Sequence, residues 1–191
     1  MSYKEYTVKV YDDGYKEWHL NGKRHREDGP AIEYASGGKF WYKNGECHRE
    51  DGPAVECANG SKEWWINGKR HREDGPAIEY ASGGKEWYKT GKRHREDGPA
   101  VECANGDKHW YKNGKLHRED GPAVEWADGS VWYFNGKCHR EDGPAVEYAN
   151  GSKEWYINGK QLTEEEFNNR NKSCDGEMVE IRGKKYRLVQ Q

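Results

Sequence analysis

Six copies of the heptapeptide HREDGPA contain the residue types in this chain that could do chemistry. They begin at His25, His48, His71, His94, His117 and His139. Imidazole and carboxylate groups are ligands for zinc, and every copy holds both. Two copies directly follow a cysteine, at Cys47 and Cys138. The pattern therefore raises two possibilities, a repeated metal site and a cysteine nucleophile with a histidine base.

Spacing and charge argue against both kinds of site. If each repeat adds two strands to a sheet, equivalent histidines lie about 10 Å apart, too far to share an ion. An arginine cation also stands in every copy. Adjacent residues of an extended chain point to opposite sides, so Cys47 and His48 point apart. The sequence shows no phosphate-binding loop, paired-carboxylate signature or nucleophile elbow, and we expect no enzymatic activity, no metal and no cofactor.

The alternative is that the heptapeptide is a structural corner. Asp28 and its equivalents are then expected to cap the Gly-Pro turn. The arginine and glutamate side chains are expected to form a charge ladder between neighbouring corners. In this interpretation, function comes from the surface that the corners hold in line.

The elements that position these corners follow from the spacing of the histidines, which is 23 residues four times and then 22. A full unit, GPAVECANGSKEWWINGKRHRED, contains two β-prone segments joined by Asn59-Gly60, a strong hairpin signal. A second Asn-Gly pair, Asn67-Gly68, ends the second segment. The pattern extends over residues 7–159 and predicts an all-β solenoid of about seven stacked hairpins.

Two aromatic positions follow each other in every unit. The first is always tryptophan, at Trp18, Trp41, Trp64, Trp87, Trp110, Trp132 and Trp155. The second varies, through His19, Tyr42, Trp65, Tyr88, Tyr111, Tyr133 and Tyr156. Because neighbours on a strand point to opposite faces, we assign the tryptophans to the packed face and the mixed row to the more exposed one. With the tryptophans we place the aliphatic row Ile32, Val55, Ile78, Val101, Val124 and Val146.

Two features leave the strand register open. A two-residue Asn59-Gly60 turn would also set Glu56 opposite Glu63, an unfavourable pairing of like charges. The sixth unit has lost one residue between Ser130 and Trp132. Because this position lies inside a strand, we expect a local kink or an altered register there.

The repeat pattern stops after Gly159. Thr163 stands three residues before Glu166, which is a capping-box signature for a short helix that covers the last hairpin. The segment EMVEIRGKKYRLV then alternates around Arg182-Gly183 and predicts a final hairpin. We therefore divide the chain into a repeat array at residues 1–160 and a C-terminal helix cap and hairpin at residues 161–191.

Composition limits the partners. The 191 residues are 35% charged with a net charge of −2, which removes the usual electrostatic argument for nucleic acid or an anionic membrane. No apolar run approaches the length of a membrane span, and MSYKEYTVKV lacks a signal-peptide core, so we expect a cytoplasmic protein with no membrane partner.

Cys57 and Cys103 occupy equivalent places two repeats apart, roughly 19 Å, which is too far for a disulfide.

The stretch EWYINGK, followed in earlier units by RHREDGPA, is similar to the MORN repeat, whose hairpins carry an aromatic pair, an Asn-Gly-Lys turn and a histidine at this spacing. MORN units usually continue with Gly-x-Gly, whereas His25 is followed by Arg26, Glu27 and Asp28, so lipid binding is not carried over. The array resembles more closely the MORN-like HREDGPA arrays of tailed phages and large DNA viruses. That resemblance implies the solenoid fold, a viral origin and the host-cell cytoplasm, but no settled activity.

Three functions remain open from the sequence. The first is binding of a host protein, with a defence component as one candidate, through the mixed row Tyr42, Trp65, Tyr88, Tyr111, Tyr133 and Tyr156. The second is binding of a nucleotide or nucleic acid through the cations of GKRHR, namely Arg24, Arg26, Arg70, Arg72, Arg93 and Arg95, although Glu-Asp follows each cluster. The third is a structural scaffold. The edge at residues 7–11 also permits pairing between chains, so the chain is either a monomer or a homo-oligomer.

Overall fold

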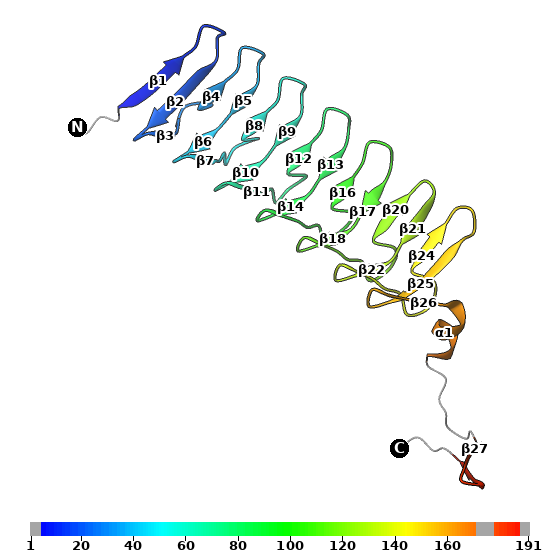
Figure 1. Cartoon of the computed structure of the whole chain (residues 1–191). Coiled ribbons are helices and arrows are strands. Elements are labelled where there is room, and N and C mark those ends of the chain that lie inside the picture. Colours follow the sequence, from blue (N-terminus) through cyan, green and yellow to red (C-terminus); the bar gives the residue numbers. More distant parts are fainter. Residues whose placement is uncertain (1–4, 171–177, 188–191) are drawn as a thin grey trace.

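The computed structural model describes residues 5–170 and 178–187. It confirms a nearly all-β repeat structure, in which long hairpins lie side by side and form one continuous antiparallel sheet of 16 strands (Figure 1). The long hairpins are β1 (Tyr6–Val10) with β2 (Lys16–Leu20), β4 (Ile32–Glu33) with β5 (Lys39–Phe40), β8 (Val55–Glu56) with β9 (Lys62–Glu63), β12 (Ile78–Glu79) with β13 (Lys85–Glu86), β16 (Val101–Glu102) with β17 (Lys108–His109), β20 (Val124–Trp126) with β21 (Gly129–Val131), and β24 (Val146–Tyr148) with β25 (Lys153–Ile157). The seven predicted hairpins are therefore present.

A second, short hairpin follows each long one, and the sequence interpretation missed it. The short hairpins are β2 with β3 (Lys23–Arg24), β6 (Tyr42–Lys43) with β7 (Glu46–Cys47), β10 (Trp65–Ile66) with β11 (Lys69–Arg70), β14 (Tyr88–Lys89) with β15 (Lys92–Arg93), β18 (Tyr111–Lys112) with β19 (Lys115–Leu116), β22 (Tyr133–Phe134) with β23 (Lys137–Cys138), and β25 with β26 (Lys160–Leu162). Asn67 and Gly68 both have positive φ, at 49° and 69°, as a two-residue type I′ turn requires. The second Asn-Gly pair thus closes a hairpin of its own.

The Asn-Gly pair of the long hairpin forms a different turn. Gly60 is in the left-handed region, at φ 92°, and donates its backbone N–H to the carbonyl of Cys57 at 2.9 Å. Cys57 in turn pairs with Ser61. Three residues therefore lie between the paired ones, instead of the two assumed in the sequence interpretation.

This loop length sets the register and corrects the predicted faces. Glu56 lies opposite Lys62, so the unfavourable pairing with Glu63 does not occur. Val55 lies opposite Glu63 and shares its face, so Trp64 points the other way. The grouping of the tryptophans with the aliphatic row was wrong, because a shift of one residue moves a whole strand's side chains to the opposite face.

The shorter sixth unit keeps the regular register, contrary to the prediction of a kink. Val124 lies opposite Val131, and Trp126 opposite Gly129, at the places that the regular pattern gives them. The missing residue is taken from the loop, which shrinks to two residues, because a loop accepts a deletion more easily than a paired strand. One consequence is that Ser130 stands where other units have lysine.

Buried residues form two narrow rows along the array. The row of fully buried side chains is the alanine of each HREDGPA copy, at Ala31, Ala54, Ala77, Ala100, Ala123 and Ala145. The second row is the aliphatic residue that follows, of which Ile32, Val55, Ile78 and Val146 are buried. Such a thin core needs further polar and aromatic contacts on both faces of the sheet.

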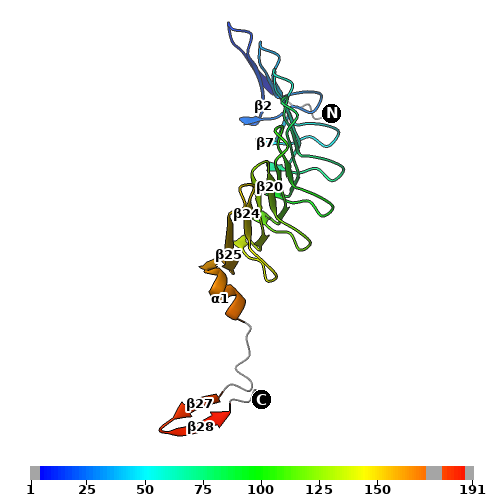
Figure 2. The same ribbon diagram turned by 90° about the vertical axis from the view of Figure 1, so that its right-hand side faces the viewer.

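The C-terminal part follows the prediction. Helix α1 (Glu164–Asn169) begins at Thr163 with a capping box to Glu166, and Phe167 is buried. The helix contacts β25 and β26 at the end of the array, and Figure 2 shows it directly next to β25. Strands β27 (Met178–Ile181) and β28 (Lys184–Arg187) form the final hairpin. In the described ranges, no helix has the length and apolar character that a membrane span needs.

Candidate interaction faces

The arginine of each heptapeptide lies at the centre of its corner. Arg72 stacks on the ring of Trp64, with its guanidinium carbon 4.0 Å from the ring centre. Its Nε donates to Asp74 at 3.0 Å, and its Nη1 donates to the Pro76 carbonyl at 3.2 Å and to Glu79 at 3.0 Å. The same contacts recur around Arg26, Arg49, Arg95, Arg118 and Arg140. The expected ladder between neighbouring corners was wrong, since each arginine pairs with the aspartate of its own corner and the glutamate of the strand that follows it.

The glycine of the heptapeptide makes room for this arginine. A Cβ atom on Gly75 would lie 3.0 Å from the guanidinium carbon of Arg72, tighter than most Cβ contacts in proteins. The guanidinium therefore lies between the Trp64 ring and the backbone of Gly75. The fixed order Arg-x-x-Gly in the heptapeptide follows from this packing.

The histidine of each heptapeptide links one unit to the next. His71 accepts a hydrogen bond at Nδ1 from the backbone N–H of Thr90, in the short hairpin of the next unit, at 3.1 Å. All six histidines make this bond, at 3.0–3.1 Å, to Asn44, Asn67, Thr90, Asn113, Asn135 and Asn158. The Nε2 atom of His71 faces the carboxylate of Glu73 at 3.8 Å. The heptapeptide thus builds the corner and fastens successive units together.

The face that carries the tryptophans, the corner arginines and the Glu-Lys pairs is called the charged face here. Glu79 lies opposite both Lys62 and Lys85, so glutamates and lysines alternate across neighbouring strands. The same glutamate accepts from Arg72, which adds a second cation. Opposite charges are thereby balanced along this face.

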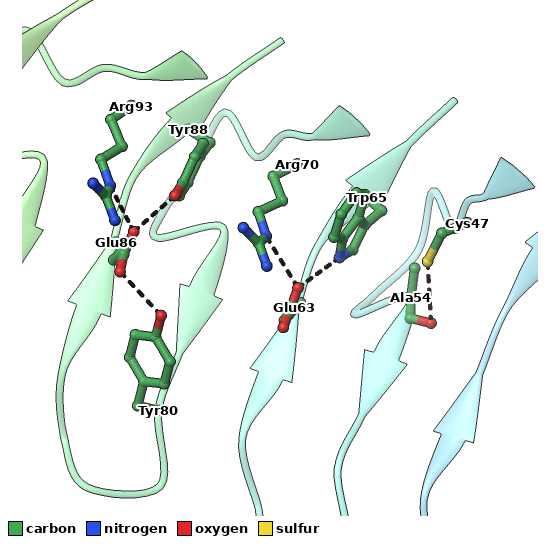
Figure 3. A network of polar contacts seen from close by, with 9 residues as sticks. All are labelled: Cys47, Ala54, Glu63, Trp65, Arg70, Tyr80, Glu86, Tyr88 and Arg93. Atoms are coloured by element: carbon green, nitrogen blue, oxygen red, sulfur yellow. Dashed lines mark hydrogen bonds and ion pairs between the residues drawn. The ribbon is translucent and has the colours of Figure 1, made fainter. Parts of the chain in front are cut away.

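The opposite face, called the aromatic face here, carries the aliphatic row, the mixed aromatic row and the remaining arginines. Glu86, in β13, is 7% exposed and accepts from Tyr80 at 3.0 Å, Tyr88 at 2.8 Å and Arg93 at 2.9 Å (Figure 3). In the unit before, Glu63 accepts from Trp65 and from Arg70. The buried Glu86 and the half-buried Glu63 thus hold rings and arginines of this face in place.

The pKa values of the Glu86 network follow from these bonds. Burial raises the pKa of Glu86, but the hydrogen bonds from Arg93, Tyr88 and Tyr80 outweigh it, and the pKa lies below its ordinary value. Burial and the bond to Glu86 raise the pKa of Tyr80 to about 12. The bond to Glu86 likewise raises the pKa of Arg93. The carboxylate is therefore ionised and the phenol neutral near neutral pH.

The structure brings the predicted aromatic row together on this face. Tyr42, Trp65, Tyr88, Tyr111, Tyr133 and Tyr156 are all half-buried, as are the tryptophans of the charged face, so neither row is the more exposed one. Arginines lie between consecutive rings: Arg70 is 5.0 Å from Trp65 and 5.5 Å from Tyr88, and Arg93 is 5.5 Å from Tyr111. From Trp65 to Tyr111 the row is therefore a ladder of alternating rings and cations, whereas Tyr42, Tyr111 and Tyr133 lie opposite Cys47, Leu116 and Cys138 in their short hairpins.

The six arginines considered for nucleic acid divide between the two faces. Arg26, Arg72 and Arg95 are the corner arginines of the charged face. Arg24, Arg70 and Arg93 lie on the aromatic face and pair with Glu17, Glu63 and Glu86. Every one of them forms an ion pair within the chain, which reduces the field that a phosphate would meet.

A further aromatic row, which the sequence interpretation missed, lies at the tips of the long hairpins. Tyr11, Tyr34, Tyr80 and Tyr148 have exposed fractions of 46%, 43%, 42% and 39%. Tyr80 bonds to Glu86, which places its ring on the aromatic face. The available signal was the position two residues after the aliphatic row, which is Tyr34, Cys57, Tyr80, Cys103, Trp126 and Tyr148 along the chain. Tyr11 takes the same position in the first unit, two residues after Lys9. These tip rings are among the most exposed large rings of the array, together with Phe134 at 42%.

The cysteines of the described residues are free thiols. Burial raises the pKa of Cys47 to about 12, and Sγ of Cys47 contacts the carbonyl of Ala54 at 3.8 Å. Burial raises the pKa of Cys138 to about 11. His48 uses Nδ1 for the bond from Asn67. These thiols are protonated near neutral pH, the less nucleophilic form.

Comparison with known proteins does not assign the chain to a family. No family model matches the chain, and no curated protein matches it.

Proposed function

We propose that the chain is a non-enzymatic binding protein that holds a protein partner on its aromatic face. The observation that carries the proposal is the row of tip rings, with Tyr34 and Tyr80 more than two-fifths exposed on a rigid repeat. Tyrosine, tryptophan and arginine dominate the energetic centres of protein interfaces, and this face presents all three. The Tyr80 ring is already held by the buried Glu86, so it loses less conformational entropy on binding.

The kind of partner follows from the resemblance to MORN-like arrays of phages and large DNA viruses. A chain of viral origin acts in the host-cell cytoplasm, where a host protein is the natural target. A component of host defence is one candidate within this class of partner.

A nucleotide or nucleic acid is the second candidate, because the ladder of rings and cations at Trp65, Arg70 and Tyr88 has the parts of a stacking platform. The ion pair of Arg70 with Glu63 at 3.1 Å weighs against it. A polyanion would have to compete with a carboxylate already in place.

The test is purification of the tagged chain from host lysate, followed by mass spectrometry of bound proteins and denaturing extraction of bound small molecules. The double variant Tyr80→Ser, Tyr148→Ser removes two tip rings from the aromatic face. The matched control, Lys85→Ser, Lys153→Ser, alters the charged face in the same two hairpins. Thermal unfolding of all three proteins shows whether the array stays folded.

We expect one stoichiometric protein that the tyrosine variant loses and the lysine variant keeps. Equal capture by both variants would contradict the choice of face. If a nucleotide is released instead and its affinity for the chain depends on salt, the second candidate, nucleotide or nucleic-acid binding, would be favoured. Copurification with virus particles would support a structural scaffold instead.

A further inference from the structure

The two ends of the array are built differently. At the C-terminal end, α1 contacts β25 and β26 and buries Phe167. At the N-terminal end, β1 is the outermost strand of the sheet, and no strand of the described residues pairs with its outer edge. This strand is also one of the longest in the array, at five residues.

The outer edge of β1 carries backbone groups that no strand of the described residues pairs with, and exposed apolar side chains. Tyr11 donates its backbone N–H to Tyr15 at 2.9 Å across the first hairpin. Because the direction of backbone groups alternates in an antiparallel pair, Thr7 and Lys9 face β2, while Val8 and Val10 direct their N–H and C=O groups outward. Val8 is 45% exposed and Val10 65%. An edge of this kind is a template for another strand.

The sequence of β1 complements itself in an antiparallel arrangement. Centred on Val8, two copies place Val8 opposite Val8, Val10 opposite Tyr6, and Lys9 opposite Thr7. In this register, the outward backbone groups of Tyr6, Val8 and Val10 meet one another and form hydrogen-bonded pairs. The neighbouring register, centred on Lys9, would place two lysines directly opposite each other, which is destabilising.

We propose that the chain forms a two-fold symmetric dimer by antiparallel pairing of β1 with β1 of a second copy, centred on Val8. The two sheets then continue into one, with Val8 packed against Val8 of the second copy and Val10 against its Tyr6. The dimer leaves the aromatic faces of both copies open, so it doubles the surface proposed for binding without using it.

The experiment is sedimentation equilibrium of the full chain over a wide range of concentration, with two charge variants of the central residue. The wild type is expected to reach twice the chain mass of 22.2 kDa. Val8→Lys and Val8→Glu each place like charges across the two-fold axis, so each alone is expected to weaken the dimer by about tenfold or more. An equimolar mixture of the two variants is expected to restore the dimer, because the charges opposite each other then attract.

The equimolar mixture of the two variants still tests the contact if the fold of one variant is less stable. Circular dichroism of each variant alone reports folding, and a folded pair that dimerises only when mixed establishes the contact at Val8. A wild type that stays monomeric at every concentration would overturn the proposal. A dimer that survives both variants unchanged would overturn it too, since the contact must then lie elsewhere.

Discussion

The charged face and the aromatic face arise from the same repeat but differ in how much they vary from unit to unit. On the charged face, all six corner arginines lie 4.0–4.1 Å from a tryptophan ring and form the same ion pairs. On the aromatic face, the position that Glu86 takes in its unit varies along the chain. Its residues are Glu17, Phe40, Glu63, Glu86, His109, Val131 and Glu154. The difference indicates that one face holds the stack together while the other is free to carry a specific surface. The following variants test this division, from the largest expected effect to the smallest.

Removing a corner arginine is expected to have the largest effect. Arg72→Ala loses the stack on Trp64 and the hydrogen bonds to Pro76 and Glu79. The backbone carbonyl of Pro76 is then left without the arginine donor. Charged hydrogen bonds and a cation–π contact together suggest a loss of about 2–3 kcal/mol in the free energy of unfolding. Thermal unfolding measures it, with exposed Lys85→Ala as the control that we expect to change little. An equal loss in both variants would contradict the special role of the corner.

Neutralising the buried carboxylate of the aromatic face is expected to cost somewhat less, about 1–2 kcal/mol at neutral pH. Glu86→Gln keeps the shape but loses the charge that Arg93 pairs with. The folded-state pKa of Glu86 is lowered, so the carboxylate adds stability above its unfolded value of 4.5 and loses it as pH falls through the folded value. Thermal unfolding of wild type and variant should therefore converge as the solution is acidified below that range. A constant gap at all pH values would contradict the assignment.

Adding one carbon beside the corner arginine is expected to cost roughly 1 kcal/mol. In Gly75→Ala the new Cβ meets the guanidinium of Arg72 at 3.0 Å. The same substitution in an Arg72→Ala background should cost clearly less, because the obstacle is gone. This double-mutant cycle is measured by denaturant unfolding, and additive effects would show that Gly75 acts through its own backbone instead.

The smallest expected effect is a gain in stability, from a substitution in the short-hairpin turn at Thr90. Thr90 adopts φ 53°, in the left-handed region that a β-branched residue tolerates poorly, where the equivalent position in other units is asparagine. Thr90→Asn is expected to add about 0.5–1 kcal/mol to the free energy of unfolding by relieving this strain. The reciprocal variant Asn67→Thr should lose a similar amount. Thermal midpoints that move in the same direction in both variants would contradict the strain argument.

The repeat architecture could be predicted because its signals are local and recur. The 23-residue period, the Asn-Gly pairs and the capping box at Thr163 and Glu166 each act within a few residues. The strand register could not be predicted, because Asn59-Gly60 is compatible with a loop of two or three residues. A shift of one residue moves the side chains of a strand to the opposite face. The corner arginine escaped prediction for another reason. Its contacts reach Trp64, eight residues before Arg72, and Glu79, seven residues after it, and no local rule connects them.

By itself, the sequence determined that this chain stacks seven β-hairpin units, where each unit begins and ends, and which residues recur at its corners. These properties depend on backbone preferences that short stretches of sequence already express. The tertiary structure alone decided which side chains share a face, that the second Asn-Gly pair closes its own hairpin, and that Tyr34 and Tyr80 are among the exposed rings. Those outcomes depend on loop closure and on contacts between units, which exist only once neighbouring hairpins lie side by side.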